Sequence, residues 1–201
     1  MVDSEQAEPQ PVRGTSAGEK IRPTRSIVMV GLMGAGKSAI GRRLATRLDM
    51  DFIDADTEIE TAAGCTVEEI FERHGEAAFR DGERRVIARL LDGPALVMAT
   101  GGGAFMDETT RDAIAKAAIS VWLRADLETL VRRTAKRNNR PLLKTDDPAK
   151  TLKDLMVVRH PIYELSDIMV ESDDGPLDET VDSVCVALDA FAAKSIQNGA
   201  Q

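Results

Sequence analysis

Short apolar runs alternate with longer segments of helical periodicity along most of the chain. The runs are typical of buried parallel strands, because a strand that helices cover on both faces has apolar side chains throughout. They occupy residues 27–30, 52–54, 96–100, 119–123 and 168–170. Apolar residues at helical spacing predict helices over residues 37–48, 83–91, 107–117, 126–137 and 178–193. This alternation predicts an α/β fold in which helices cover both faces of a parallel sheet.

One further helix is marked by its first residues. Thr66 and Glu69 have the spacing of a capping box, in which each side chain accepts a hydrogen bond from the other residue's backbone N–H. Gly75 follows two turns later and is expected to end this helix, since glycine readily adopts the left-handed conformation that stops one.

The two ends of the chain lack this periodicity. Residues 1–25 are polar, contain several prolines and glycines, and have few large apolar side chains, so we expect a flexible tail there. Residues 194–201 are similar in character. These limits leave one folded domain over residues 26–193.

Composition narrows the possible partners. The chain has 201 residues, which fits one domain, and its 34 acidic residues outnumber 26 basic ones for a net charge of −8. Since nucleic acids and many membrane surfaces are anionic, we expect neither as a partner. No apolar run reaches the length of a membrane span, the first residues lack the apolar region of a signal peptide, and the two cysteines form no CxxC pair. We expect a soluble cytoplasmic protein, with a monomer as the default state.

The most specific motif follows the first predicted strand. Residues 31–38 read G-L-M-G-A-G-K-S, a full match to the phosphate-binding pattern G-x-x-x-x-G-K-[ST]. Glycines let successive backbone N–H groups approach phosphate oxygens, and the helix that follows adds the positive end of its dipole. Lys37 supplies a charge for the β- and γ-phosphates, and the Ser38 hydroxyl can bind Mg²⁺. The sequence therefore predicts a nucleotide-phosphate site.

Other features separate the classes of protein that share this loop. The chain has neither the N-K-x-D nor the D-x-x-G motif expected of a GTPase. A motor ATPase usually has an acidic residue at the end of a later strand, but the third predicted strand ends in Thr100 and three glycines. Asp54, at the end of the second predicted strand, is the acid best placed to help organise magnesium. This arrangement favours a kinase that acts on a small molecule.

Three further clusters lie near predicted strand ends or in connections, where α/β proteins bind ligands. Asp54 and Asp56 place two carboxylates two residues apart, so one can face magnesium while the other receives substrate hydroxyls. Arg80 precedes Glu83 by three residues and offers a planar fork for a carboxylate. Gly101, Gly102 and Gly103 allow a ligand to contact backbone directly. Structural alternatives remain open here: Asp54 as a helix cap, and Arg80 or Arg159 as members of ion pairs.

Together these residues resemble the shikimate kinase family. The resemblance runs from about residue 25 to residue 193 and rests on G-L-M-G-A-G-K-S, F-I-D-A-D-x-x-I-E, I-F-x-x-x-G-E-x-x-F-R-x-x-E, T-G-G-G, R-P-L-L and R-x-x-x-Y. It implies a five-stranded parallel sheet in the order 2-3-1-4-5. It also implies transfer of phosphate from ATP to shikimate, giving shikimate 3-phosphate in aromatic amino-acid biosynthesis. One departure concerns Glu164-Leu165-Ser166, where family members often have another acid and an alanine.

The resemblance carries over to individual residues on the acceptor side. Shikimate would be bound by Asp56, Arg80, Gly102 and Arg159, with support from Gly101, Gly103 and Glu83. The substrate-binding segment would cover about residues 56–83. Asp56 would orient the attacking 3-hydroxyl and accept its proton late, because a loose transition state needs little help from a base.

On the donor side, the ATP phosphates would be bound by Gly34, Ala35, Gly36, Lys37, Ser38 and Ala39. One Mg²⁺ ion per subunit would be bound by Ser38 directly and by Asp54 through water. Arg133 would lie along the adenine, and Arg140 would close over the transferring phosphate from a lid at about residues 135–147. Lys37, Arg140 and Mg²⁺ would neutralise the charge that spreads over the γ-phosphoryl oxygens.

Two other functions remain open at this point. A gluconate-type sugar-acid kinase shares the phosphate loop, although the two aspartates, the F-R-x-x-E motif and the three glycines favour shikimate. A non-catalytic ATP-binding module of the same fold would be expected to lack Asp54, Asp56 or Arg140, and all three residues are present.

Overall fold

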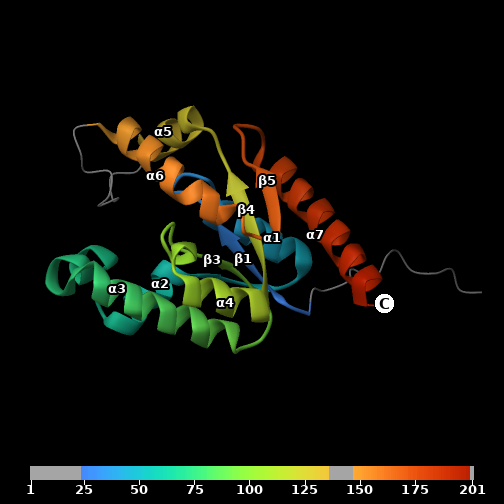
Figure 1. The fold of residues 1–201 in the computed structure, drawn as a ribbon, viewed down its shortest axis with the longest axis horizontal. Helices are drawn as coiled ribbons and strands as arrows, with labels where there is room; N and C mark the ends of the chain where they lie inside the picture. The colour runs from blue at the N-terminus through green and yellow to red at the C-terminus, as the bar shows by residue number, and fades with distance from the viewer. Residues whose placement is uncertain (1–23, 136–146, 200–201) are drawn as a thin grey trace, which may run out of the picture.

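The computed structural model describes residues 24–135 and 147–199, which form a five-stranded parallel sheet flanked by helices (Figure 1). The strand order is β2-β3-β1-β4-β5, which confirms the predicted fold class and topology. In chain order the elements are β1 (Ser26–Val30), α1 (Lys37–Leu48), β2 (Asp51–Asp54), α2 (Ala55–Ala63), α3 (Val67–Leu91), β3 (Leu96–Ala99), the 3₁₀ turn η1 (Ala104–Met106), α4 (Glu108–Ala117), β4 (Ala118–Arg124), α5 (Leu127–Ala135), α6 (Pro148–Tyr163), β5 (Ile168–Glu171) and α7 (Leu177–Gly199).

The core is built around the central strand β1, which is buried along its whole length. It pairs with β3 on one side and β4 on the other, so its register aligns Met29 with Ala99 and with Val121. Helices α1 and α7 pack against each other beside the sheet, and α4 packs against β4 and α3 (Figure 1). Because all strands are parallel, the carboxyl ends of β1, β2 and β3 meet at one edge, where the segments that follow them lie together.

Most expected elements are present, with two informative differences in the helices. The capping box of Thr66 and Glu69 is formed, and Gly75 has a left-handed φ of 78° that interrupts α3 as predicted. Helical structure resumes directly after Gly75 and continues to Leu91, so the predicted start at residue 83 was too late. Helices α2 and α6 were not named among the predicted elements. Helix α2 is short, and in α6 the apolar stripe is obscured because Val157 and Val158 are apolar but exposed.

The ends of the folded region also extend beyond the predicted limits. Arg25, placed in the expected tail, donates hydrogen bonds to the carbonyl oxygens of Ala115 and Ala118 at 2.7 and 2.6 Å. Helix α7 continues past Ala193 to Gly199. Residues 1–23 of the predicted tail, residues 136–146 of the predicted lid and Arg140 within it lie outside the described residues.

Candidate active site

The phosphate loop connects β1 to α1 and folds back on itself through a lysine. Gly31, Gly34 and Gly36 all have positive φ angles, of 136°, 85° and 92°. This explains why the motif requires glycine at its fixed positions 31 and 36, and why glycine also suits the variable position 34. The buried side chain of Lys37 crosses the loop, and its Nζ donates hydrogen bonds to the carbonyl oxygens of Gly31 at 2.8 Å and Leu32 at 3.0 Å. The loop therefore combines a fixed cation with the amino end of α1, as an anion site requires.

Asp54 joins the end of β2 to this loop. Its Oδ2 accepts a hydrogen bond of 2.6 Å from the Ser38 hydroxyl, and its Oδ1 accepts one of 3.2 Å from the backbone N–H of Asp56. The second contact makes Asp54 the N-cap of α2. The capping role and the predicted position beside Ser38 are thus compatible, because different oxygens of one carboxylate serve them.

Gly101 is closely approached by the two carboxylates of the acceptor side. A Cβ atom at this position would lie 2.8 Å from Oε1 of Glu83 and 2.9 Å from Oδ1 of Asp56, closer than real Cβ contacts. Asp56 comes from α2 and Glu83 from α3, the two helices that connect β2 to β3, so both carboxylates meet at the turn after β3. A side chain at Gly101 would therefore displace one of these carboxylates.

The next two glycines are approached in the same way by the two arginines. A Cβ atom at Gly102 would lie 3.1 Å from Nη1 of Arg159, and one at Gly103 would lie 2.6 Å from Nη1 of Arg80. The sequence predicts that a ligand contacts the backbone at these glycines. The structure gives them a further role, because each leaves room for a charged side chain of the candidate site.

Arg80 and Glu83 form a partly buried ion pair on α3. Nη1 of Arg80 donates to Oε2 of Glu83 at 2.6 Å, while Nε and Nη2 contact Glu76 at 3.3 and 3.2 Å. Glu83 is only 2% exposed, and its Oε1 has no hydrogen-bond partner among the described residues. Burial raises the pKa of Glu83, the charge of nearby Asp56 raises it further, and Arg80 opposes both effects. Glu83 therefore holds Arg80 in place and leaves one buried oxygen directed toward Gly101.

Tyr163 is the residue of this site that the sequence analysis did not single out. It stands one helical turn after Arg159 on α6, it is fully buried, and its hydroxyl is hydrogen bonded both to the carbonyl oxygen of Gly102 and to Arg159. Burial raises the pKa of Tyr163 to about 12, so the hydroxyl stays protonated at neutral pH. The R-x-x-x-Y motif contained this residue, but only the fold shows that Tyr163 links Arg159 to the glycine turn.

We expect Tyr163→Phe to raise the KM for the acceptor substrate about fivefold to tenfold and to leave the KM for the nucleotide within about twofold, since the hydroxyl contacts Gly102 and Arg159 on the acceptor side. The ratio of mutant to wild-type KM should stay constant between about pH 6 and pH 9, because the native hydroxyl does not ionise there. Steady-state kinetics at several pH values measures both effects. A shift of the KM for the nucleotide as large as that for the acceptor would contradict this assignment.

Arg133, on α5, reaches the phosphate loop from the other side. Its Nη1 donates to the carbonyl oxygen of Gly34 at 3.3 Å and to the hydroxyl of Ser172 at 3.1 Å, and Nη2 donates to the carbonyl oxygen of Asp173. Burial lowers the pKa of Arg133, and the neighbouring Arg132 lowers it further. The side chain is thus held against the loop, in agreement with a place on the nucleotide side.

The structure brings together every predicted site residue that it describes. The phosphate loop, Asp54, Asp56, Arg80, Glu83, residues 101–103 and Arg159 gather around the carboxyl ends of β1, β2 and β3. Ala35 and Ala39 lie in the loop and the first turn of α1. Only Arg140 is not placed, because it lies outside the described residues.

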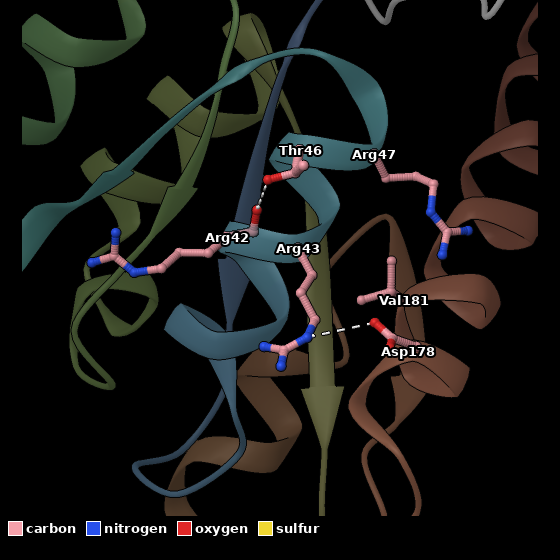
Figure 2. A pocket seen from close by; sticks show the side chains of 6 residues that line it. All are labelled: Arg42, Arg43, Thr46, Arg47, Asp178 and Val181. Atoms are coloured by element: carbon pink, nitrogen blue, oxygen red, sulfur yellow. Dashed lines mark hydrogen bonds and ion pairs between the residues drawn. The ribbon is translucent and has the colours of Figure 1, made fainter.

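A separate hollow lies between α1 and α7, away from these residues. It is lined by Arg42, Arg43, Thr46, Arg47, Asp178 and Val181 (Figure 2). Nε of Arg43 lies 3.5 Å from Oδ1 of Asp178, but both side chains are largely exposed. Exposed ion pairs of this kind contribute about 0–1 kcal/mol to stability, and the hollow contains none of the predicted site residues.

The described helices include none that could cross a lipid bilayer, because none is both long enough and apolar enough.

Comparison with known proteins identifies the family. The chain matches the family model described as shikimate kinase over residues 33–189. A shikimate kinase of Paramagnetospirillum magneticum is 60% identical over 157 residues, which make up 78% of this chain and 80% of that protein. The chain belongs to the shikimate kinase family. The predicted family and enzyme class are confirmed, and the co-substrate of this family is ATP.

Solved structures agree with this family membership. The shikimate kinase from Acinetobacter baumannii, determined in complex with shikimate, is 38% identical and superposes with a TM-score of 0.78 over 82% of this chain and 92% of that one. A gluconokinase from Sinorhizobium meliloti is 19% identical with a TM-score of 0.58, covering 87% and 97% of the two chains. The second similarity shows a shared fold alone.

Proposed function

We propose that this shikimate kinase family member transfers the γ-phosphoryl group of ATP to the 3-hydroxyl of shikimate, with the residues described above in the roles that follow. The observation that carries the proposal is the turn at residues 101–103, where each glycine contacts a charged side chain of the acceptor site. Two arginines and two carboxylates meet there, a short distance from the phosphate loop. This combination suits a substrate with one carboxylate and several hydroxyl groups.

On the donor side, Lys37 and the N–H groups of residues 34–39 bind the phosphates. Lys37 holds its charge against the Gly31 and Leu32 carbonyls of the loop, where it can stabilise the negative charge that is spread over the γ-phosphoryl oxygens during transfer. Arg133 flanks the loop at Gly34, which supports its place beside the nucleotide. Arg140 remains a proposed contact to the transferring phosphate.

The residues near the loop fit a magnesium ion. Ser38 and Asp54 offer a hydroxyl and a carboxylate 2.6 Å apart, and no three His, Cys, Asp or Glu side chains of the described residues lie together as a cage of their own. Mg²⁺ at nucleotide sites takes most of its ligands from phosphate and water, so a direct contact to Ser38 and a contact to Asp54 through water meet its needs. When bound, the ion supplies positive charge to the β- and γ-phosphates.

On the acceptor side, side chains of opposite charge bind the two ends of the substrate. Arg80 and Arg159 bind the carboxylate of shikimate, and both are largely buried, so their attraction for an anion is screened little by water. Asp56 binds the hydroxyl end, orients the 3-hydroxyl toward the γ-phosphate and takes its proton as the new P–O bond forms. Glu83 positions Arg80 through the 2.6 Å ion pair.

We propose that the protein acts as a monomer. The substrate-binding segment at about 56–83 then corresponds to α2 and most of α3, within a single folded domain.

An ADP-release assay tests the function. Purified protein with ATP and Mg²⁺ receives shikimate, gluconate or no acceptor, and the phosphorylated product is identified by mass spectrometry. We expect ADP release that depends on shikimate and yields a monophosphate. ADP release with gluconate alone would overturn the assignment of shikimate as acceptor. ATP binding without turnover on either acceptor would indicate a non-catalytic nucleotide-binding module.

The turn at residues 101–103, here called the glycine turn, gives a prediction that concerns one substrate only. Gly103→Ala places a methyl group 2.6 Å from Nη1 of Arg80, so the guanidinium must move away from its position beside the turn. We expect the KM for shikimate to rise at least about tenfold, since a charged hydrogen bond to the carboxylate is lost or lengthened. The KM for ATP should stay within about twofold, because Gly103 lies outside the phosphate loop.

Gly82→Ala provides the matched control. Gly82 lies within α3, between Arg80 and Glu83, and an added Cβ atom would meet nothing within 4 Å. Removing a glycine from a helix interior should raise the free energy of unfolding by about 0.5–1 kcal/mol and leave both KM values unchanged. Equal kinetic effects of Gly82→Ala and Gly103→Ala would disprove the steric argument.

A further inference from the structure

Ser172 joins three segments that lie far apart in the sequence. It directly follows β5 and is 1% exposed, and its hydroxyl donates a hydrogen bond of 2.9 Å to the carbonyl oxygen of Ala35 in the phosphate loop. The same hydroxyl accepts a hydrogen bond of 3.1 Å from Nη1 of Arg133 on α5. Its backbone N–H donates to the carbonyl oxygen of Arg124 at 2.6 Å, which fixes the residue beside the end of β4.

The contact to Ala35 has a consequence for the opposite side of the same peptide. In a trans peptide the C=O and the following N–H point in opposite directions. A hydroxyl that holds the Ala35 carbonyl toward β5 therefore holds the Gly36 N–H away from β5. Gly36 is the N-cap of α1, so this N–H belongs to the amino end of the helix, where a phosphate binds.

The contact to Arg133 acts on the neighbouring peptide. Nη1 of Arg133 also donates to the carbonyl oxygen of Gly34 at 3.3 Å, so the Ser172 hydroxyl helps to fix an arginine that itself holds the loop. Ser172 and Arg133 thus hold two successive carbonyl groups of the phosphate loop. Because glycines at 34 and 36 allow the loop to adopt other conformations, these contacts restrict the loop to one of them.

We propose that Ser172 is a positioning residue for the nucleotide: through the Ala35 carbonyl and Arg133 it holds the phosphate loop in its binding conformation. This inference rests on the proposed function only in that the loop binds the phosphates of ATP. It assigns Ser172 no contact with shikimate, and the residue lies on the β5 side of the loop, apart from the glycine turn. Loss of the hydroxyl must therefore affect the two substrates differently.

Ser172→Ala tests the inference when binding of ADP is measured by isothermal titration calorimetry and both KM values are measured by steady-state kinetics. We expect the Kd for ADP and the KM for ATP to rise about tenfold, with the KM for shikimate within about twofold of wild type. Ser172→Thr retains the hydroxyl and should restore ADP binding to within about threefold. Ser172→Cys keeps nearly the native volume with a weak donor, so it provides a second test if the alanine variant does not fold.

Ser120→Ala is the matched control for stability. Ser120 is also a buried serine, 3% exposed, and its hydroxyl bridges β4 to Asp167 at 2.7 Å without contacting the phosphate loop. We expect a similar loss of thermal stability in Ser120→Ala and Ser172→Ala, but weaker ADP binding only in Ser172→Ala. A Ser172→Ala protein that melts earlier yet binds ADP as wild type does, or that loses affinity for both substrates equally, would overturn the inference.

Different experimental results would contradict the proposed function and the proposed role of Ser172. Wild-type protein that binds ADP but does not phosphorylate shikimate would contradict the proposed function, while the comparison of ADP affinities would still decide the role of Ser172.

Discussion

Lys37→Met is expected to lower kcat about 10³-fold or more while the protein remains folded. The physical reason is the position of the ammonium group. Nζ lies within 3.0 Å of two carbonyl oxygens that line the phosphate loop, and the side chain is 9% exposed, so its charge acts in a region largely shielded from water. Methionine fills a similar volume but supplies no charge for the γ-phosphoryl oxygens in the transition state.

Single-turnover kinetics with saturating ATP and shikimate measures this effect, and circular dichroism with thermal melting checks the fold. Lys116→Met on the exposed surface of α4 controls for the loss of a lysine and should behave as wild type. A Lys37→Met protein that keeps more than about a tenth of the wild-type kcat would contradict the assignment of this loop to the transferred phosphate.

Arg159→Ala is expected to raise the KM for shikimate about 100-fold and to change the KM for ATP by less than about threefold. Arg159 is 8% exposed, its Nη1 lies beside Gly102, and Tyr163 holds its orientation. Loss of a buried charged hydrogen bond to a carboxylate costs about 2–5 kcal/mol of binding free energy. A cost of about 2.7 kcal/mol corresponds to a KM about 100-fold higher. Initial-rate measurements over a matrix of both substrates separate the two KM values.

Arg85→Ala is a suitable control, because Arg85 on α3 is largely exposed and its ion pair with Asp81, at 3.0 Å, lies on the surface. This variant should keep both KM values. Equal increases in both KM values for Arg159→Ala would identify Arg159 as a structural ion-pair residue, which is the alternative that its sequence alone left open.

Local sequence features predicted the parts of the site that depend on neighbouring residues. The phosphate loop, the capping box at Thr66 and the break at Gly75 are all formed, since each requires only residues within one turn or loop. The strands were recognisable for a similar reason: buried parallel strands carry apolar residues at every position. Helix α2 was less visible because it is short, and α6 because the exposed Val157 and Val158 obscure its apolar stripe.

Contacts between distant segments account for what the sequence analysis missed. It included Tyr163 in a motif but gave it no role, since its partner Gly102 is 61 residues away. It gave Ser172 no role at all, since Ala35 is 137 residues away. Nothing in the spacing of residues along a chain indicates such pairs, because the approach of two segments is set by how the helices pack on the sheet.

The sequence by itself determined the five strands, most of the helices, the phosphate loop and the resemblance to the shikimate kinase family, because these follow from periodicity and from motifs of adjacent residues. The tertiary structure decided which charged groups meet. It placed Glu83 and Asp56 against Gly101, Arg159 against Gly102 and Arg80 against Gly103. Asp56, Arg80 and Glu83 come from the connection after β2, and Arg159 comes from the connection after β4. They converge because the carboxyl ends of parallel strands lie at one edge of the sheet.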